Sequence, residues 1–372
     1  MTNGDPNSNN NALSSDSNET EFKDLLEKAA QGDAVAQNTL SSCYFTGRGV
    51  EKDLEKAIYW FTKSAEQGND VGEKGLGVCY YYGYGVEKDS KKAIYWWTKA
   101  AKHGNADAQY NLGVCYSSGD GVEKDPKKAV EWYMKSSDQG EAAAQLSLGI
   151  CYVNGEGVEK DPKKAVYWWT KAAKQGDAGA QYNLGLCYFT GEGVEEDWEK
   201  AVYWWTKAAD QGNADAQNDL GICYFTGEGV KENLKKAVFW WTKAAKQDDD
   251  DAQCSLGHCY KSGEGVEKDY EKAVEWYIKA SEQGNARAQN ELGTCYYNNE
   301  GVSRDYEKAV YWWMKAAEQG NDEAQYNLGY CYKSGDGVEK DEEKAVYWYT
   351  KASEQGNDDA QYVLQRLKSA TQ

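Results

Sequence analysis

The chain has 372 residues and a formal net charge of −19, and aromatic residues make up 13% of it. This negative charge opposes binding to nucleic acid or to an anionic membrane surface. No apolar run approaches the ~20 residues that a membrane-spanning helix requires. We therefore expect no nucleic-acid partner, no membrane insertion and a cytoplasmic location, with non-classical export left open.

The N-terminal segment differs from the rest of the chain. Residues 1–20 are rich in Asn, Ser and Asp and contain no apolar stretch. This composition is typical of a disordered polar tail and lacks the apolar core of a secretory signal peptide. Residues 21–32 are predicted to form an N-terminal capping helix. Ten cysteines without such a signal indicate a reducing compartment, where thiols stay free.

A cysteine recurs every 36 residues through nine copies of one pattern, and a period in this range indicates a solenoid. This cysteine column comprises Cys43, Cys79, Cys115, Cys151, Cys187, Cys223, Cys259, Cys295 and Cys331. The copies are residues 33–68, 69–104, 105–140, 141–176, 177–212, 213–248, 249–284, 285–320 and 321–356, and a C-terminal capping half-repeat, 357–372, follows. We predict an all-α fold, a right-handed α-solenoid (α/α superhelix) of helix–turn–helix repeats.

The third copy illustrates how each repeat folds. Asn105 is placed to cap a first helix, in which Ala108, Leu112 and Cys115 follow at helical spacing on one stripe. Asp125 is placed to cap a second helix. Two short helices cannot bury their apolar faces alone, so each copy must stack on its neighbours.

Three columns of residues are predicted to lie in the core. A mid-helix glycine costs about 1 kcal/mol relative to alanine, so its recurrence indicates close helix packing. The cysteine column is interpreted as small buried residues, because stacked helices lie ~8–10 Å apart, too far for disulfides. The tryptophans at 60, 96, 132, 168, 204, 240, 276, 312 and 348 are assigned to the inter-repeat core. Partial exposure is expected of Cys254 and of the adjacent Trp97, Trp169, Trp205, Trp241 and Trp313.

The repeated pattern resembles the Sel-1-like repeat (SLR) family, which is related to the tetratricopeptide repeat. In the fifth copy the matching residues are Ala180, Gln181, Leu184, Gly185, Tyr188, Gly191, Gly193, Val194, Asp197, Lys200, Ala201 and Trp204. The resemblance implies a protein-binding scaffold or adaptor, since family members assemble signalling complexes, serve protein quality control or mediate bacterium–host contact. One secreted, cysteine-rich branch has paired disulfides in each repeat and β-lactamase activity. This chain has one column cysteine per repeat, which argues against that branch.

Catalysis has little support in the residues. The chain has only two histidines, in different copies, and no Ser-x-x-Lys motif. We expect no enzyme activity, no cofactor and no metal site. Two alternatives stay open: a secreted cysteine-rich ligand-binding or β-lactamase-like protein, and a translocated host-interaction effector.

The expected binding site is the concave groove lined by the first helix of each copy. By analogy with tetratricopeptide repeats, the exposed positions lie five, four and one residues before the column cysteine and two after it. The partner-binding residues predicted there are Tyr110, Asn111, Val114, Leu146, Ile150, Tyr182, Asn183, Leu186, Phe189, Ile222 and Phe225. The expected partner is a protein or peptide segment with apolar anchors flanked by basic residues, bound by a monomer. Packing against the neighbouring first helix is an alternative role for some of these residues.

Overall fold

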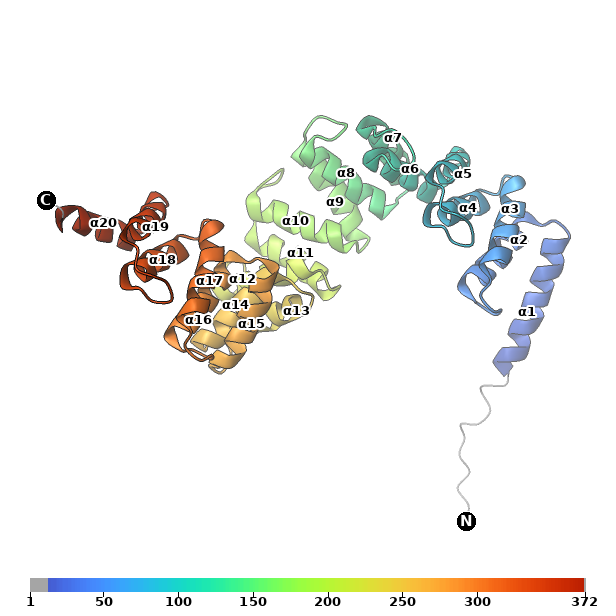
Figure 1. The fold of residues 1–372 in the computed structure, drawn as a ribbon. Coiled ribbons are helices and arrows are strands. Elements are labelled where there is room, and N and C mark those ends of the chain that lie inside the picture. The colour runs from blue at the N-terminus through green and yellow to red at the C-terminus, as the bar shows by residue number, and fades with distance from the viewer. Residues whose placement is uncertain (1–12, 371–372) are drawn as a thin grey trace, which may run out of the picture. The chain divides into compact units, whose positions relative to one another are not determined.

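The computed structural model describes residues 13–370, and in this range the regular elements are all α-helices (Figure 1). The first, α1, covers Leu13–Ala30, so it begins earlier than the helix expected from residue 21. Residues 1–12 of the expected polar tail lie outside the described residues. None of the described helices is long and apolar enough to cross a membrane.

Each of the nine copies supplies two helices, here called the A helix and the B helix. The A helices are α2 Ala34–Thr46, α4 Asp70–Tyr82, α6 Ala106–Ser118, α8 Ala142–Asn154, α10 Ala178–Thr190, α12 Ala214–Thr226, α14 Asp250–Ser262, α16 Ala286–Asn298 and α18 Asp322–Ser334. The B helices are α3 Leu54–Glu66, α5 Ser90–Lys102, α7 Pro126–Asp138, α9 Pro162–Lys174, α11 Trp198–Asp210, α13 Leu234–Ala245, α15 Tyr270–Gln283, α17 Tyr306–Glu318 and α19 Glu342–Glu354. The half-repeat forms α20 Asp358–Ala370. The predicted tandem helix pairs and all-α solenoid class are confirmed.

The helix caps are those that the sequence predicts. The Asn105 side chain accepts a hydrogen bond of 3.0 Å from the backbone N–H of Ala108 at the start of α6. The Asp125 side chain likewise accepts one of 3.1 Å from Lys128 N–H at the start of α7. These caps satisfy backbone donors that have no partner within the helix. The boundaries of both helices are therefore specified locally.

The helices group into two compact units, which are described separately below. The first comprises the residues up to Ala180 together with Glu192–Val194. The second comprises Gln181–Gly191 and the residues from Glu195 onward. The second unit thus holds most of the fifth copy and the whole of copies six to nine.

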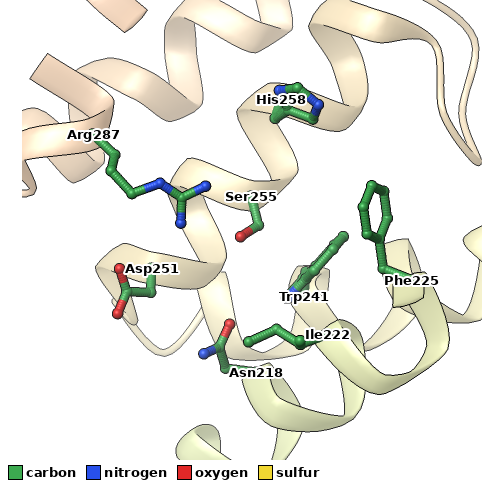
Figure 2. A pocket seen from close by; sticks show the side chains of 8 residues that line it. All are labelled: Asn218, Ile222, Phe225, Trp241, Asp251, Ser255, His258 and Arg287. Carbon is green, nitrogen blue, oxygen red and sulfur yellow. The ribbon is translucent and has the colours of Figure 1, made fainter. Parts of the chain in front are cut away.

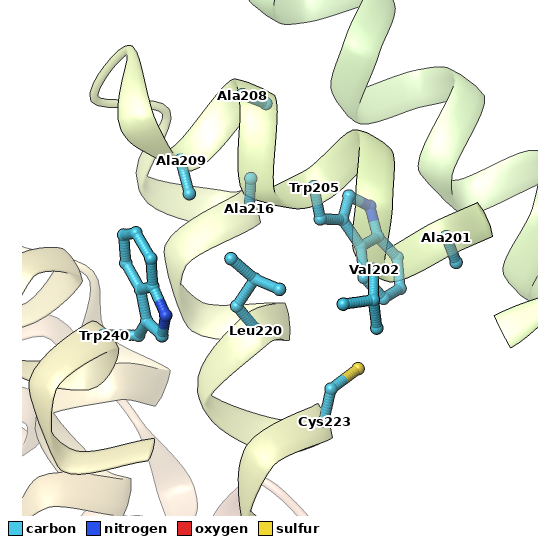
Figure 3. Close-up of a cluster of buried hydrophobic side chains, with 9 residues drawn as sticks. All are labelled: Ala201, Val202, Trp205, Ala208, Ala209, Ala216, Leu220, Cys223 and Trp240. Carbon is cyan, nitrogen blue, oxygen red and sulfur yellow. The ribbon is translucent and has the colours of Figure 1, made fainter. Parts of the chain in front are cut away.

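A core cluster of the second unit shows how adjacent copies are joined (Figure 3). Leu220 and Cys223 of α12 are buried between α11, which contributes Trp205, and α13, which contributes Trp240. Small alanines of α11 and α12 complete the cluster and let these helices approach closely. Because one A helix packs against B helices of its own and the preceding copy, the core continues from copy to copy.

The mid-helix glycines explain why the residue after the column tryptophan of each B helix is buried. A Cβ on Gly257 would lie 2.7 Å from Cδ1 of Tyr277, and one on Gly221 would overlap the indole of Trp241. The missing Cβ therefore makes room for an aromatic ring, as the predicted close approach requires. Trp205 and Trp241 are only 2% and 4% exposed.

The expected partial exposure of Trp97, Trp169, Trp205, Trp241 and Trp313 is therefore wrong, since all five are buried. Their neighbours in the tryptophan column, assigned to the core, pack against the inter-repeat clusters and are mostly half-buried. The difference arises because the residue after the column tryptophan faces the glycine of its own A helix.

The cysteine column is buried as predicted, apart from half-buried Cys43. All ten cysteines are thiols. Burial raises the pKa of the Cys115 thiol to about 11 and that of Cys295 to about 12. Cys254, expected to be exposed, is only 2% exposed, because it packs in the cluster around Tyr277.

A ladder of glutamine pairs, which we did not predict, connects the two helices of each copy. Nε2 of Gln139 donates to Oε1 of Gln109 at 2.8 Å, and Nε2 of Gln109 donates to the carbonyl of Ala101 in the preceding copy at 3.2 Å. The second copy departs from this pattern, with Glu73 and His103 in the equivalent positions. The ladder satisfies polar groups that stacking would otherwise bury unpaired.

Candidate functional site

The A helices expose the positions that flank the buried cysteine column. Ile222 is 42% exposed although the next residue, Cys223, is 2% exposed. Successive side chains on a helix point about 100° apart, so a column buried on one side leaves its neighbour at the surface. We call the surface formed by these positions the A-helix face.

Two neighbouring cavities open on the A-helix face of the second unit, and Ile222 lines both. The first, here called the acidic pocket, has a volume of about 200 Å³. It is lined by Tyr182, Leu186, Phe189, Trp198, Trp205, Asp219, Ile222, Cys223 and Glu228. Tyr182, Leu186, Phe189 and Ile222 are predicted partner-binding residues, and the structure brings these four together.

Aromatic rings form much of the wall of the acidic pocket. The Phe189 ring lies edge-on to Trp198, with centroids 4.5 Å apart, and its centroid is 5.5 Å from that of Trp205. Trp205 is in turn held against Gly185 of the same copy. The wall is therefore set by core packing and does not depend on a bound ligand.

The acidic pocket also contains two carboxylates, Asp219 and Glu228. Asp219 accepts a hydrogen bond from the Tyr182 hydroxyl, and Glu228 accepts one of 3.2 Å from Thr226. Burial raises the pKa of Asp219 from 3.8 to about 7, against the opposing effect of the Tyr182 hydrogen bond. The nearby charges of Asp215, Asp249 and Asp251 add to the rise. Burial and then Asp219 likewise raise the pKa of Tyr182.

The second cavity, here called the Arg287 pocket, is shown in Figure 2 and has a volume of about 380 Å³. Its apolar wall is Ile222, Phe225 and Trp241, of which the sequence analysis named the first two. Its polar lining consists of Asn218, Asp251, Ser255, His258 and Arg287. The buried side-chain oxygen of Asn218 has no hydrogen-bond partner within the part of the chain that the structure describes. This cavity combines an apolar wall with hydrogen-bonding groups.

The first unit has a cavity of its own, about 250 Å³ in volume, on its A-helix face. It contains three predicted residues, Tyr110, Asn111 and Val114. The other lining residues are Val78, Tyr81, Tyr82, Trp97 and Cys115. The same helix positions thus form hollows in both units.

Three predicted residues do not line these cavities. Ile150 is 40% exposed, while Leu146 and Asn183 are half-buried. Leu146 lies beside Gly179, where an added Cβ would contact its Cδ2 at 3.2 Å. Its packing fits the alternative role that we considered for some of these positions.

Several lining residues were missed. Asp219 occupies the position four before the column cysteine, which was considered only where it is Asn. Trp198 and Trp205 lie on the B helix, and Glu228 lies in the turn between the helices. The unbroken series of aromatic residues after the column tryptophan could have indicated that Trp205 faces the A helix.

Aromatic side chains are also exposed on the B helices. The residue before the column tryptophan is about half exposed in Tyr59, Tyr95, Tyr167, Tyr203, Phe239, Tyr311 and Tyr347. Each ring lies edge-on to its neighbouring tryptophan, with centroids about 5 Å apart for Tyr203 and Trp204. This face is separate from the A-helix face and offers control positions for binding experiments.

Metal ligands are not clustered in the structure. Among the described residues, no group of three or more His, Cys, Asp or Glu side chains is arranged to hold a metal ion.

Paired helices in tandem define this protein as an all-α solenoid of helix–turn–helix repeats. The family model for the Sel1 repeat matches residues 34–69, 72–105, 106–141, 142–177, 178–213, 214–249, 250–285, 286–321 and 322–357. The chain belongs to the Sel1 repeat family. Proteins of this family are generally interaction scaffolds and are typically non-enzymatic.

Two solved structures are similar over most of the chain. One is a protective antigen present in uropathogenic Escherichia coli strains that displays an SLR fold; it is 35% identical, with 93% of this chain and 82% of that chain covered and a TM-score of 0.75. The other is a Sel1 repeat protein from Oxalobacter formigenes, also 35% identical, with 83% and 90% covered and a TM-score of 0.62. No curated protein matches the chain.

Proposed function

We propose that this chain is a non-catalytic scaffold that holds a segment of a partner protein on the A-helix face of its second unit. The observation that carries the proposal is the pair of adjacent cavities that share Ile222. Leu186, Phe189 and Phe225 supply further apolar surface in them. Concave sites with apolar walls and a few placed polar groups are the usual form of a binding site.

The charge of the face favours a partner with basic residues beside its apolar anchors. Burial raises the pKa of Asp219 and of Asp249, and the nearby charges of Asp215 and Asp251 raise both further. Among the residues lining the two cavities, Arg287 carries a positive charge. Complementary charge speeds association and is screened by salt, so binding should weaken as ionic strength rises.

The test begins with isolation of a partner on the immobilised full chain and its identification by mass spectrometry. Its affinity is then measured for Leu186→Ala, Phe189→Ala and Tyr203→Ala. Tyr203 is 54% exposed on α11 and is a suitable control for the opposite face, whereas Trp205 is buried in the core. Truncating a central anchor costs about 2 kcal/mol or more, so roughly a thirtyfold loss is expected for the first two variants.

Circular dichroism must show that all three variants are folded. Unchanged affinity for Tyr203→Ala, with losses for Leu186→Ala and Phe189→Ala, would support the A-helix face. Loss of binding in Tyr203→Ala alone would place the partner on the B helices and refute the proposal.

The proposal includes a reducing cellular compartment. It is supported by thiols that are buried one per copy, without the second column cysteine of the disulfide-rich branch. Mass spectrometry of the non-reduced protein purified from its own cells should detect no disulfide bridge. Several bridges would favour the secreted alternative.

A further inference from the structure

Three positions meet at the junction between copies seven and eight, where they form an ion cluster. Lys261 lies two residues after the column cysteine of copy seven. Its Nζ is 2.9 Å from Oε2 of Glu291 and 3.5 Å from Oε2 of Glu300. Glu291 and Glu300 lie four residues before and five residues after the column cysteine of copy eight. At this junction an ammonium group therefore lies between two carboxylates, and the chain itself supplies that ammonium group.

The junction between copies five and six has carboxylates at the equivalent two positions but no cation at the third. The position of Lys261 is taken by Phe189, and those of Glu291 and Glu300 are taken by Asp219 and Glu228. All three line the acidic pocket, whose lining contains no Lys, Arg or His. Of the nine copies, only the sixth and the eighth have acidic residues at both positions.

Other junctions satisfy their carboxylates with hydroxyl groups. The Tyr297 hydroxyl donates to Oδ2 of Asp336 at 3.0 Å, from the position equivalent to Phe189. The Tyr81 hydroxyl donates in the same way to Asp120. A phenylalanine cannot donate, so the side chain at position 189 cannot pair with the carboxylates of its junction.

The rest of the acidic pocket suits the stem and the charge of a long cationic side chain. Leu186 and Ile222 offer aliphatic surface for methylene groups. The rings of Phe189, Trp198 and Tyr182 also line the pocket, and a cation over the face of such a ring, within about 6 Å of its centroid, is attracted to it. The volume of about 200 Å³ is smaller than the roughly 300–1,000 Å³ typical of pockets for drug-sized ligands, and therefore suits a single side chain.

We propose that the acidic pocket binds the side chain of a lysine or arginine of the partner polypeptide, with the cation between Asp219 and Glu228. This inference rests on the proposed function, because the A-helix face must be where the partner lies. Asp219 and Glu228 take the places of Glu291 and Glu300 as the two carboxylates, and the partner's side chain takes the place of Lys261.

The electrostatic state of Asp219 is consistent with this role. Burial holds its pKa at about 7, and the titratable groups around it are Tyr182, Cys223, Glu228, Asp215, Asp249 and Asp251. All of these are neutral or negative, so the carboxylate has no positive neighbour among them. A bound cation would compensate for the desolvation and favour the ionised carboxylate.

The pocket can be tested without a known partner, by methyl NMR of protein labelled at Ile δ1. Isoleucine occurs at positions 58, 94, 150, 222 and 278 only. Ile222 lines the pocket and reports on binding there. Ile150 is an internal control, because it is similarly exposed at the equivalent position of the fourth copy. That copy has Ser147 where the sixth copy has Asp219. The probes are n-butylammonium and its neutral counterpart 1-butanol.

We expect n-butylammonium to shift the Ile222 signal saturably, with a Kd that is roughly millimolar, and to leave Ile150 unchanged. Asp219→Asn should weaken this binding roughly tenfold, whereas Asp210→Asn, an identical change on the exposed end of α11, should not. Phe189→Lys should abolish it, because the new ammonium group can occupy the carboxylate pair as Lys261 does. Acetyl-Gly-Lys-Gly-amide should bind more tightly than its norleucine counterpart, which has no charge.

Equal shifts with 1-butanol, or unchanged binding in Asp219→Asn, would overturn the proposal by showing an apolar pocket without charge selectivity. Binding of n-butylammonium without binding of the lysine peptide would refute a polypeptide side chain as the ligand. If Phe189→Lys does not fold, the Asp219→Asn result decides. These measurements need no partner, so they are independent of the partner-affinity test. The cation proposal can be refuted while Leu186→Ala and Phe189→Ala still lose partner affinity, and it can hold when they do not.

Discussion

Glu73 and His103 face each other in the second copy, with Oε2 of Glu73 3.0 Å from Nδ1 of His103. They replace the glutamine pair that other copies have at these positions. Glu73 is fully buried, and its other carboxylate oxygen, Oε1, lies 4.0 Å from Nζ of Lys99 but has no hydrogen-bond partner among the described residues. A glutamine there could donate to the carbonyl of Ala65, as Gln109 does to Ala101.

We therefore expect the double variant Glu73→Gln, His103→Gln to be more stable than the natural chain by about 1–3 kcal/mol. A buried polar group without a hydrogen bond costs that much, and the variant restores the ladder. Thermal melting followed by circular dichroism measures the effect. Glu66→Gln, at an exposed acid near the end of α3, is the control. A double variant that melts no higher than this control would contradict the explanation.

The close approach of the mid-helix glycine to its aromatic partner predicts a cost for adding one methyl group. Gly257→Ala should destabilise the chain by about 1–3 kcal/mol, because the Cβ would lie 2.7 Å from Cδ1 of Tyr277. Gly179→Ala is a matched change in α10, where the nearest neighbour is the mobile end of Leu146. It should be neutral or stabilising, since alanine favours helix. Similar melting temperatures for the two variants would show that the glycine column does not serve close packing.

The ion cluster at Lys261 should contribute to stability. Burial alone would lower the pKa of Lys261, but the charge of Glu291 and its hydrogen bond raise it. Lys261→Met keeps most of the side-chain volume and leaves two half-buried carboxylates without a cation. We expect a loss of about 1–3 kcal/mol, because breaking such a pair leaves uncompensated charge. Lys279→Met, at an exposed lysine of α15, should have little effect on stability. An equal loss of stability in Lys279→Met would show that Lys261 contributes no more than an exposed lysine does.

Asp219 should make stability depend on pH. Its folded-state pKa of about 7 exceeds its ordinary value of 3.8, so between these values the folded chain holds a proton that the unfolded chain has released. Stability contributed by this group is therefore lost as pH rises through that window. Asp219→Asn should match the natural chain near pH 4 and exceed its stability by about 1–3 kcal/mol near pH 8. Melting curves with equal pH slopes for both proteins would show that Asp219 titrates normally.

The buried thiols should react slowly. Burial raises the pKa of Cys79, Cys223 and Cys331 to about 12, and it is the thiolate that reacts with disulfide reagents. Ellman's reagent should label the native protein slowly and all ten cysteines rapidly in denaturant, and a reductant should leave the melting temperature unchanged. Rapid labelling of most thiols in the native state would contradict the burial of the column.

The sequence by itself determined the class of fold, the register of the repeats and the helix boundaries. These depend on local signals repeated nine times: caps such as Asn105 and Asp125, and the stripe of small and apolar residues on each A helix. It also indicated which A-helix positions reach the surface, so that Leu186, Phe189 and Ile222 could be placed on one face.

Only the tertiary structure decided which of two adjacent aromatic residues of each B helix is more deeply buried, the column tryptophan or the residue after it. The choice depends on the gap that a glycine leaves in the A helix of the same copy. The acidic pocket likewise depends on residues from α10, α11, α12 and the turn after α12. Its two carboxylates meet Phe189 only because stacking places one copy's A helix beside the next, and this geometry sets the environment that raises the pKa of Asp219.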